Sequence, residues 1–425
     1  MSEWKYLKLG LTSTQFIDGD RSKKYPARND FLESGVLFLN GESINTGVIR
    51  QEFANYISEE KYAEITKGRI KKGDILLTTR GNSLGDCAIV KIPDRGLINA
   101  QMLILRPKSN EIAFSFLFYY LRSNSAKDMM INISSGSAQP QIPIQDLKFL
   151  SLPIPPLPIQ QKIAAVLSAY DDLIENNDRR IALLEKMAEE IYREWFVRLR
   201  FPGHEQVTFH KGIPEGWKIQ PLQEITRINE KSVMKGKEPK TITYIDIGSV
   251  TTNRINNIEK INFNDAPGRA RRIVRHGDTI WSTVRPANRA YCLILDPIQN
   301  LIASTGFAVM SPKKYIPYSF LYWVTTSNTF VEHISNVAKG SAYPAAGKED
   351  FEKSEILIPS EELLWRFHAL CEPMLKQKHT LAERNKNLKQ TRDRLLTRLI
   401  SGKLSVEDLD IQFPPSMIAE TNPTK

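Results

Sequence analysis

The chain has 425 residues, of which 41% are hydrophobic and 25% charged, and its formal net charge is +10. This composition predicts a folded protein with more than one domain, and the positive charge is compatible with a polyanionic partner. Three dispersed cysteines argue against a disulfide framework, and neither a signal peptide nor a transmembrane run is visible, so the sequence predicts a cytoplasmic protein.

Comparison of the chain with itself reveals an internal repeat. At an offset of about 204 residues, KKGDILLTT (71–79) aligns with RHGDTIWST (275–283), and SGSAQP (135–140) aligns with KGSAYP (339–344). Cys87 and Cys292 align at an offset of about 205, which indicates a one-residue slip between blocks. The chain therefore contains two diverged copies of one unit.

Each copy begins with a β-rich stretch. In the first copy, GDILLTTR, DCAIVKI and QMLILRP have the apolar and β-branched content of short strands, and FSFLFYYLRSNSAKDMMINI has helical periodicity. The sequence predicts an α+β domain in each copy, with Tyr119, Tyr120, Tyr322 and Trp323 in the cores.

A long helix follows the first β-rich stretch. Its expected seam, with alternating spacings of four and three, consists of Ile163, Leu167, Tyr170, Ile174, Asn177, Ile181, Leu184, Ala188, Ile191 and Trp195. A period of 3.5 residues is typical of a coiled coil, and a polar residue on the seam, such as Asn177, fixes its register.

The second copy ends in a matching helix. Its expected seam consists of Phe367, Leu370, Met374, Gln377, Leu381, Arg384, Leu388, Thr391 and Leu395. Pro373 lies within this segment and predicts a kink or a split, because proline removes a helical hydrogen bond. We expect the two helices to pair antiparallel with approximate two-fold symmetry; the alternative is that each packs only on its own domain.

These elements predict five segments. They are a globular domain over 1–156, a helical spacer over 157–204, a second globular domain over 205–360, a second helical spacer over 361–404 and a flexible tail over 405–425. The two domains carry 20 basic and 16 acidic residues, and 20 basic and 15 acidic residues, respectively. Two basic modules at a fixed separation suit duplex DNA, with each module reading a few base pairs.

Candidate DNA-binding residues occur at matching places in the two copies, as side chains able to reach phosphates or base edges. In the first copy they are Lys67, Arg69, Thr79, Arg80, Asn82, Ser83, Ser137, Gln139 and Gln141. In the second copy they are Arg269, Arg271, Arg272, Arg285, Asn288, Arg289, Ser341 and Tyr343. The alternative interpretation is that the arginines are solvated surface residues and that the glycine–serine loops only shape turns.

Catalytic and metal-binding motifs are not found in the sequence. It has no G-x-G-x-x-G, no G-x-x-x-x-G-K-[ST], no H-E-x-x-H and no C-x-x-C. We therefore expect a recognition protein that is not an enzyme, with no catalytic residue and no metal site.

The chain resembles the specificity subunits of type I restriction-modification systems. The resemblance rests on LPIPPLPIQQKIAAVLSAYDDLIENNDRRIALLEKMAEEIYREWF, KKGDILLTTRGNSLG, SSGSAQPQI and LKQTRDRLLTRLISGKL, and it extends from Trp4 to about Leu404. The second helical segment departs from it, because IPSEELLWRFHALCEPMLKQ lacks the P-P-L-x-x-Q-x-x-I start of the first.

The resemblance implies a function in phage defence and DNA methylation. Two target recognition domains would each read one half of a bipartite, asymmetric site, and the helices would set the gap and dock two modification subunits. Restriction subunits with translocase and nuclease activity would join this core. S-adenosylmethionine, ATP and Mg²⁺ would bind to the partner subunits, and this chain would need no cofactor.

Two other functions are compatible with the residues. The first is a duplicated coiled-coil adaptor whose basic surface is incidental. The second is a nuclease or methyltransferase with unrecognised motifs. Salt-dependent, sequence-selective DNA binding distinguishes a specificity subunit from the adaptor, and binding of a methyl donor by the isolated chain would indicate the enzyme.

Overall fold

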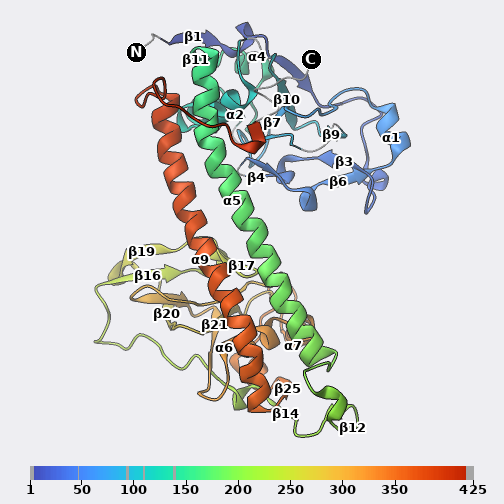
Figure 1. Cartoon of the computed structure of the whole chain (residues 1–425), viewed down its shortest axis with the longest axis vertical. Helices are drawn as coiled ribbons and strands as arrows, with labels where there is room; N and C mark the ends of the chain where they lie inside the picture. The colour runs from blue at the N-terminus through green and yellow to red at the C-terminus, as the bar shows by residue number, and fades with distance from the viewer. Residues whose placement is uncertain (1–3, 46, 92–94, 109–110, 137–139, 418–425) are drawn as a thin grey trace. The chain divides into compact units, whose positions relative to one another are not determined.

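The computed structural model describes residues 4–45, 47–91, 95–108, 111–136 and 140–417, and the chain divides into two compact units. Unit 1 comprises Met1–Asn176 and Asn385–Lys425, and unit 2 comprises Asn177–Arg384. The division cuts both long helices, so each unit is one globular copy together with part of each helix (Figure 1).

Unit 1 contains two main sheets. The first has the order β2–β10–β7–β8 and is antiparallel; the second has the order β6–β3–β9, with β3 and β9 parallel. The strands are β2 (Gln15–Asp18), β3 (Val36–Leu39), β6 (Asn55–Ile57), β7 (Ile75–Thr78), β8 (Cys87–Ile89), β9 (Gly96–Ile98) and β10 (Met102–Arg106). Two smaller pairs are β1 (Lys5–Lys8) with β11 (Ser151–Ile154), and β4 (Ile44–Asn45) with β5 (Val48–Ile49).

Unit 2 repeats this topology, which confirms the internal repeat. Its sheets have the orders β15–β24–β21–β22 and β19–β16–β23–β20, with β16 and β23 parallel. The strands are β15 (Thr226–Ile228), β16 (Thr241–Ile245), β19 (Glu259–Asn262), β20 (Ala270–Ile273), β21 (Thr279–Ser282), β22 (Tyr291–Leu293), β23 (Leu301–Ser304) and β24 (Phe307–Pro312). The smaller pairs are β14 (Lys218–Pro221) with β25 (Glu355–Ile358), β17 (Val250–Thr251) with β18 (Arg254–Ile255), and β12 (Phe209–His210) with β13 (Ile213–Pro214).

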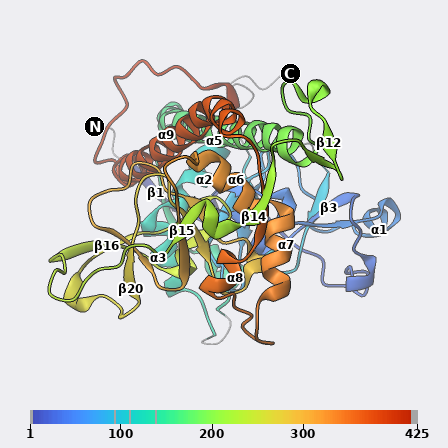
Figure 2. The same cartoon turned by 90° about the horizontal axis from the view of Figure 1, so that it is seen from below.

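Short helices cover the sheets. They are α1 (Glu59–Glu64), α2 (Phe114–Arg122), α3 (Asn124–Asn132) and α4 (Ile144–Leu147) in unit 1, and α6 (Tyr318–Thr326), α7 (Asn328–Val337) and α8 (Lys348–Glu352) in unit 2 (Figures 1 and 2). The periodic segment after Phe114 forms two helices, because Ser123 is extended and its hydroxyl caps α3 by accepting from the Ala126 amide. Ser327 caps α7 in the same way. Tyr119, Tyr120, Tyr322 and Trp323 are buried, as expected.

Strand register corrects the alignment of the cysteines. Cys292 pairs with Ile280 on β21, whereas Cys87 pairs with Leu77 on β7 and Ala88 pairs with Leu76. Because Leu76 and Ile280 are equivalent at an offset of about 204, Ala88 is the counterpart of Cys292. The one-residue slip therefore lies after β8.

The long helices α5 (Leu157–Tyr192) and α9 (Glu361–Ile400) pack against each other within each unit. In unit 1, Ile163 and Leu167 share a core with Leu399 and Ile400. In unit 2, the Tyr192 ring centroid lies 6.2 Å from that of Phe367. In unit 1 the start of α5 thus contacts the end of α9, and in unit 2 the end of α5 contacts the start of α9. The pairing is therefore antiparallel in each unit.

The seam of α9 differs from the expected one in every second position. Leu370 is 47% exposed, and Gln377, Arg384 and Thr391 are also exposed. The seam instead uses the next residue each time, namely Cys371, Lys378, Asn385 and Arg392. The spacing after Phe367 is therefore four then three, not three then four, and the heptad period itself is retained.

The polar seam residues of α9 find partners on α5 within their own unit. Lys378 forms an ion pair with Glu185 at 2.5 Å, and the Asn385 amide donates to the Ile174 carbonyl oxygen at 3.3 Å. Arg392 forms an ion pair with Asp171. Helix α9 also continues through Pro373, so the expected split does not occur.

Residues 405–417 belong to the segment for which the sequence predicts a loose tail. In the structure they pack on unit 1, because Val406 and Met417 are buried in its core and Ser416 donates to Asp172 at 2.7 Å. Residues 418–425 lie outside the described part of the chain.

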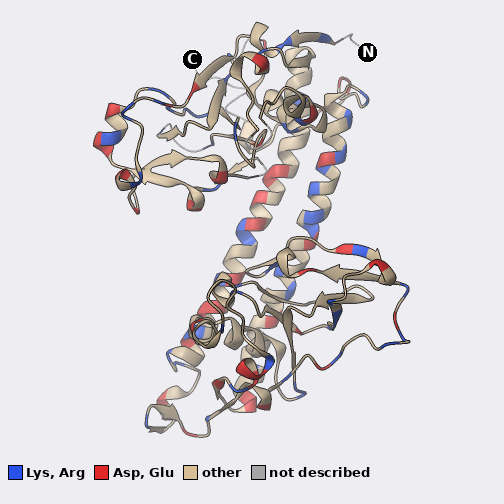
Figure 3. Cartoon of the chain, turned by 180° about the vertical axis from the view of Figure 1, so that it is seen from behind, with Lys and Arg blue, Asp and Glu red and all other residues tan. Residues whose placement is uncertain are grey.

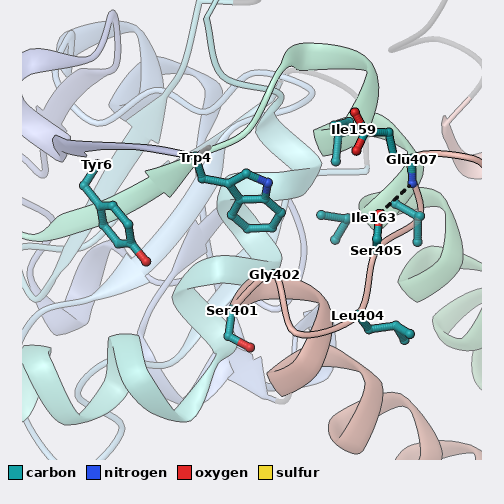
Figure 4. Close-up of a pocket in the computed structure, with 10 residues that line it drawn as sticks. Trp4, Tyr6, Ile159, Ile163, Ser401, Gly402, Leu404, Ser405 and Glu407 are labelled. Carbon is teal, nitrogen blue, oxygen red and sulfur yellow. Dashed lines mark hydrogen bonds between the residues drawn. The ribbon is translucent and has the colours of Figure 1, made fainter. Parts of the chain in front are cut away.

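Unit 1 has a cavity of about 380 Å³ beside Trp4, which precedes β1 (Figure 4). It is lined by Trp4, Gly402, Ser405 and Glu407, among others. The equivalent tryptophan of unit 2, Trp217, is covered by Phe201, with ring centroids 5.0 Å apart. Phe201 and Ser405 occupy equivalent positions after the two long helices. Unit 1 therefore has a serine where unit 2 has the phenylalanine that covers the tryptophan, and the cavity lies at this place.

Candidate functional site

Two loops of unit 1 are joined by backbone hydrogen bonds. One follows β7 and begins at Thr79; the other precedes Ile142. The Gly81 amide donates to the Pro140 carbonyl at 3.2 Å, and the Ile142 amide donates to the Thr79 carbonyl at 2.9 Å. These bonds fix the two loops as one surface, called here the paired loops.

Unit 2 has the same paired loops. The Arg285 amide donates to the Pro344 carbonyl at 2.7 Å, and the Ala346 amide donates to the Thr283 carbonyl at 2.9 Å. Thr79 and Thr283 are anchored alike, since each hydroxyl donates to a carbonyl in the turn that connects the two main sheets of its unit, that of Gln101 or Gly306.

The matching bonds define which side chains are equivalent. Gly81 corresponds to Arg285, and Gly85 corresponds to Arg289, whereas Arg80 corresponds to Val284. Gly81 and Gly85 have φ values of 92° and 83°, and Arg285 and Arg289 have 50° and 53°. Unit 2 therefore places arginines where the backbone favours glycine, at a cost of about 1 kcal/mol each.

Arg285 is exposed and is held by the second loop of its pair. Its guanidinium carbon lies 4.6 Å from the ring centroid of Tyr343, and its Nη2 donates to the Ala342 carbonyl at 3.3 Å. Tyr343 is itself 70% exposed. The pair thus presents a preoriented cation and an aromatic face to solvent.

The other candidates of unit 2's paired loops are Asn288, Arg289 and Ser341. Arg289 is anchored, because its Nη1 donates to the Asn328 side chain at 2.8 Å. Asn288 and Ser341 are exposed.

In unit 1 the paired loops bring together Arg80 and Gln141, which form a β-bridge. Asn82 is exposed, Ser83 is half-buried and Thr79 is buried. The predicted residues Ser137 and Gln139 lie outside the described residues.

Lys67 and Arg69 lie elsewhere in unit 1, beside the second sheet, where Arg69 bridges Leu97 of β9. The Arg69 guanidinium donates to the carbonyls of Ile65 and Tyr62 at 2.8 and 2.9 Å, and it stacks on the Tyr62 ring. Arg69 therefore stabilises the end of α1, while Lys67 is exposed.

The arginines in β20 and just before it have different environments. Arg269 is exposed and pairs with Asp246 at 2.6 Å, and Arg271 stacks on Phe263. Arg272 is half-buried, donates to Ser232, and has a pKa lowered by burial. Arg269 adjoins the paired loops, since its carbonyl accepts from Thr305 and the next residue, Gly306, accepts from Thr283.

Two further residues support the paired loops of unit 2: Lys339, which belongs to the candidate stretch KGSAYP, and Asn328 at the start of α7, which the sequence did not indicate. Lys339 is exposed and pairs with Ala345 through two backbone bonds of 2.9 Å, and Asn328 anchors Arg289. The sequence contained one signal for the contact between Asn328 and Arg289, which is that Arg289 aligns with Gly85. A position with glycine in one copy and arginine in the other is one where the second copy needs a partner for the larger side chain.

The long helices present two further surfaces. In unit 1, α9 exposes Lys386, Lys389, Arg394 and Arg398, none of which has an ion pair among the described residues. Figure 3 shows Lys and Arg in blue along the long helices. Helix α5 exposes apolar side chains, Leu173 in unit 1, and Leu183 and Met187 in unit 2. Leu183 and Met187 are four residues apart and therefore lie on the same face of α5, where they form a small exposed apolar patch.

Two features are absent from the described residues. No helix there is long and apolar enough to cross a membrane. No group of three or more His, Cys, Asp or Glu in that part of the chain has the arrangement of a metal site.

Two copies of one α+β unit, each presenting the same paired loops with different side chains, define a duplicated recognition protein. A family model described as "Type I restriction modification DNA specificity domain" matches residues 1–186 and 214–363. The chain belongs to this family, and its role is DNA sequence specificity through two recognition domains.

Curated relatives agree. The chain is 27% identical over 373 residues to the type I restriction enzyme MjaIX specificity subunit of Methanocaldococcus jannaschii, covering 83% of this chain and 82% of that protein. It is 24% identical to the HindI specificity subunit of Haemophilus influenzae, covering 95% of this chain and 100% of that protein. The crystal structure of a type I S subunit from M. genitalium has the same fold, with a TM-score of 0.58, 16% identity, and coverage of 94% and 96% of the two chains.

Proposed function

We propose that this chain is the non-catalytic subunit that selects the target of a type I restriction-modification complex. Each unit reads one half of a bipartite, asymmetric DNA site through its paired loops. The observation that carries the proposal is that the same loop scaffold occurs twice, with Gly81 in one copy and Arg285 in the other. One scaffold with different side chains suits two different half-sites.

Helices α5 and α9 are proposed to set the gap between the half-sites. Their seam is supported in both units by buried apolar residues and by polar pairs such as Glu185 with Lys378. A helical pair with fixed register keeps a constant length, so the number of unread base pairs is constant.

The exposed faces of the same helices are proposed to dock two modification subunits. The apolar side chains Leu183 and Met187 supply contact area for such partners, and exposed cations of α9 supply charge, namely Lys386, Lys389, Arg394 and Arg398. Transfer of methyl groups from S-adenosylmethionine to adenine, and ATP- and Mg²⁺-dependent translocation and cleavage by restriction subunits, belong to those partners.

A selection from random duplex DNA tests the proposal. The full-length chain is incubated with the library at low and at physiological salt, and the bound duplexes are sequenced. We expect two short conserved blocks separated by a fixed gap, on top of salt-dependent nonspecific binding. Enrichment of no motif would favour the adaptor alternative, and one contiguous motif would contradict the assignment of one half-site to each unit.

A further inference from the structure

Among the described residues of the paired loops, glycine in unit 1 is replaced by arginine in unit 2 at two equivalent positions, Gly81/Arg285 and Gly85/Arg289, and of the two arginines only Arg285 is exposed. Beyond its two chain neighbours, no atom of the described residues lies within 4 Å of a Cβ built on Gly81, whose φ of 92° strains the backbone of any residue except glycine. Unit 2 has Arg285 there, with a φ of 50° and a ψ of 63°. A strained, exposed arginine in a conformation that glycine adopts freely indicates a use for its side chain.

The neighbours of Arg285 orient its guanidinium and occupy only a small part of its hydrogen-bonding capacity. Tyr343 lies under the guanidinium at 4.6 Å, and one bond of 3.3 Å runs from Nη2 to the Ala342 carbonyl. No carboxylate among the described residues forms an ion pair with Arg285. A guanidinium carries five N–H donors, and the described residues bind only one of those of Arg285. Stacking restricts the rotamers of the side chain and reduces the entropy lost when it binds.

This chemistry selects a ligand with two acceptors in one plane. In the major groove of duplex DNA, guanine presents O6 and N7 as adjacent acceptors, whereas adenine and cytosine place a donor amine on that edge. A single phosphate also attracts a guanidinium, but it gives no reason to preorient the side chain on an exposed aromatic ring at a strained position.

Building on the proposed function, we infer that Arg285, oriented by Tyr343, reads a guanine in the half-site bound by unit 2. Unit 1 has no such reader at the equivalent position, because Gly81 has no side chain. The two half-sites are therefore distinguished at this position of the paired loops.

The test repeats the duplex selection with variants of the full-length chain. Arg285→Gly is expected to relax the preference for guanine at one position of one block by about 10- to 100-fold, while the other block is unchanged. Arg285→Lys keeps the charge but not the paired donors, and it is expected to relax the same position. Arg227→Ala, which removes an exposed arginine elsewhere in unit 2, serves as the matched control and should leave both blocks unchanged.

Thermal unfolding of the Arg285→Gly variant distinguishes a role of Arg285 in base recognition from a role in stabilising the fold. Because glycine relieves the strained backbone, Arg285→Gly should keep or raise the Tm. If Arg285→Gly weakens binding to all sequences equally and reduces the salt slope by about 1, Arg285 contacts a phosphate and the inference is wrong. An unchanged motif would also overturn it. If the wild-type chain selects no motif, the proposed function itself fails.

Discussion

Arg106 donates to both carboxylate oxygens of Asp74, at 2.6 and 2.8 Å. The counterpart of Asp74 in unit 2 is Asp278, and strand register places Ser311 at the position of Arg106. Burial accordingly raises the pKa of Asp278 to about 6. The same buried carboxylate is thus an ion-pair partner in one copy and a desolvated charge in the other.

We therefore predict opposite effects of two equivalent substitutions. Because the folded state raises the pKa of Asp278 above its unfolded value, this group favours folding most below about pH 4, and the contribution is lost as the pH rises through 6. Asp278→Asn should stabilise unit 2 at pH 8 by on the order of 2 kcal/mol, with no gain at pH 4. Hydrogen exchange at the two pH values, followed on β21, measures the effect.

Asp74→Asn is the matched substitution in unit 1. It leaves the Arg106 guanidinium without its carboxylate and should destabilise unit 1 by about 3 kcal/mol, seen as faster hydrogen exchange on β7 at pH 8. Equal destabilisation by both variants at pH 8 would contradict this explanation of the difference between the copies.

A second prediction concerns Asp171 of α5, which accepts hydrogen bonds from Arg122 and Tyr119 of α2 and from Arg392 of α9. Burial raises the pKa of Asp171, but Arg122 and Arg392 outweigh it and hold the pKa below the usual value. The stability from this group is therefore complete at neutral pH and is lost only as the pH falls below about 4.

Asp171→Asn should destabilise unit 1 by about 3 kcal/mol at pH 7 and by less at pH 3, as measured by urea unfolding. In unit 2 the positions equivalent to Asp171 and Arg392 are Leu375 and Ala188, which are buried and apolar. The double variant Asp171→Leu, Arg392→Ala copies that pair and should be less destabilised than Asp171→Leu alone. No recovery would show that the ion pairs themselves are required.

A third prediction concerns the cavity beside Trp4. Ser405→Phe introduces the side chain that covers the equivalent Trp217 in unit 2, and it should stabilise unit 1 by on the order of 1 kcal/mol by burying apolar surface. Ser401→Phe, at another residue that lines the cavity, is the control for a general effect of added apolar area. Equal Tm changes for the two variants would contradict the idea that the phenyl ring at position 405 fits the cavity beside Trp4.

A fourth prediction concerns the gap. The two units divide at residues 176/177 of α5 and 384/385 of α9, so a heptad inserted at both places keeps the seam in phase. Seven residues add about 10 Å of helix, which corresponds to roughly three base pairs at about 3.4 Å each. The selected motif should keep both blocks and gain about three base pairs of gap. An unchanged gap would contradict the proposal that the helices set it.

The sequence predicted the duplication, the two long helices and the buried seam of α5, because all of these depend on periodic apolar residues. It misplaced half of the α9 seam, because Lys378, Asn385 and Arg392 have the polarity of surface residues, and only their partners on α5 explain their burial. The sequence pattern also favoured Leu370 over Cys371, because leucine is the more apolar of the two. In the structure Leu370 is exposed and Cys371 is buried.

The paired loops were predicted only in part. The sequence placed Arg80 and Arg285 at matching sites, but the hydrogen bonds align Arg285 with Gly81. The same equivalence follows from extending the offset of 204 past Thr79 and Thr283, whereas the positive φ at both positions is visible only in the structure. Arg69 was a candidate because of its charge, and its role at the end of α1 became visible only from its carbonyl partners.

The most direct test of the central claim is a single-molecule map of adenine methylation in a methylation-free host that carries this chain with the modification subunit of its system. We predict methylation at a split motif of two short blocks around a constant gap, absent when this chain is omitted. A motif without a gap, or no methylation although the two proteins form a complex, would contradict the claim that two recognition units read two half-sites.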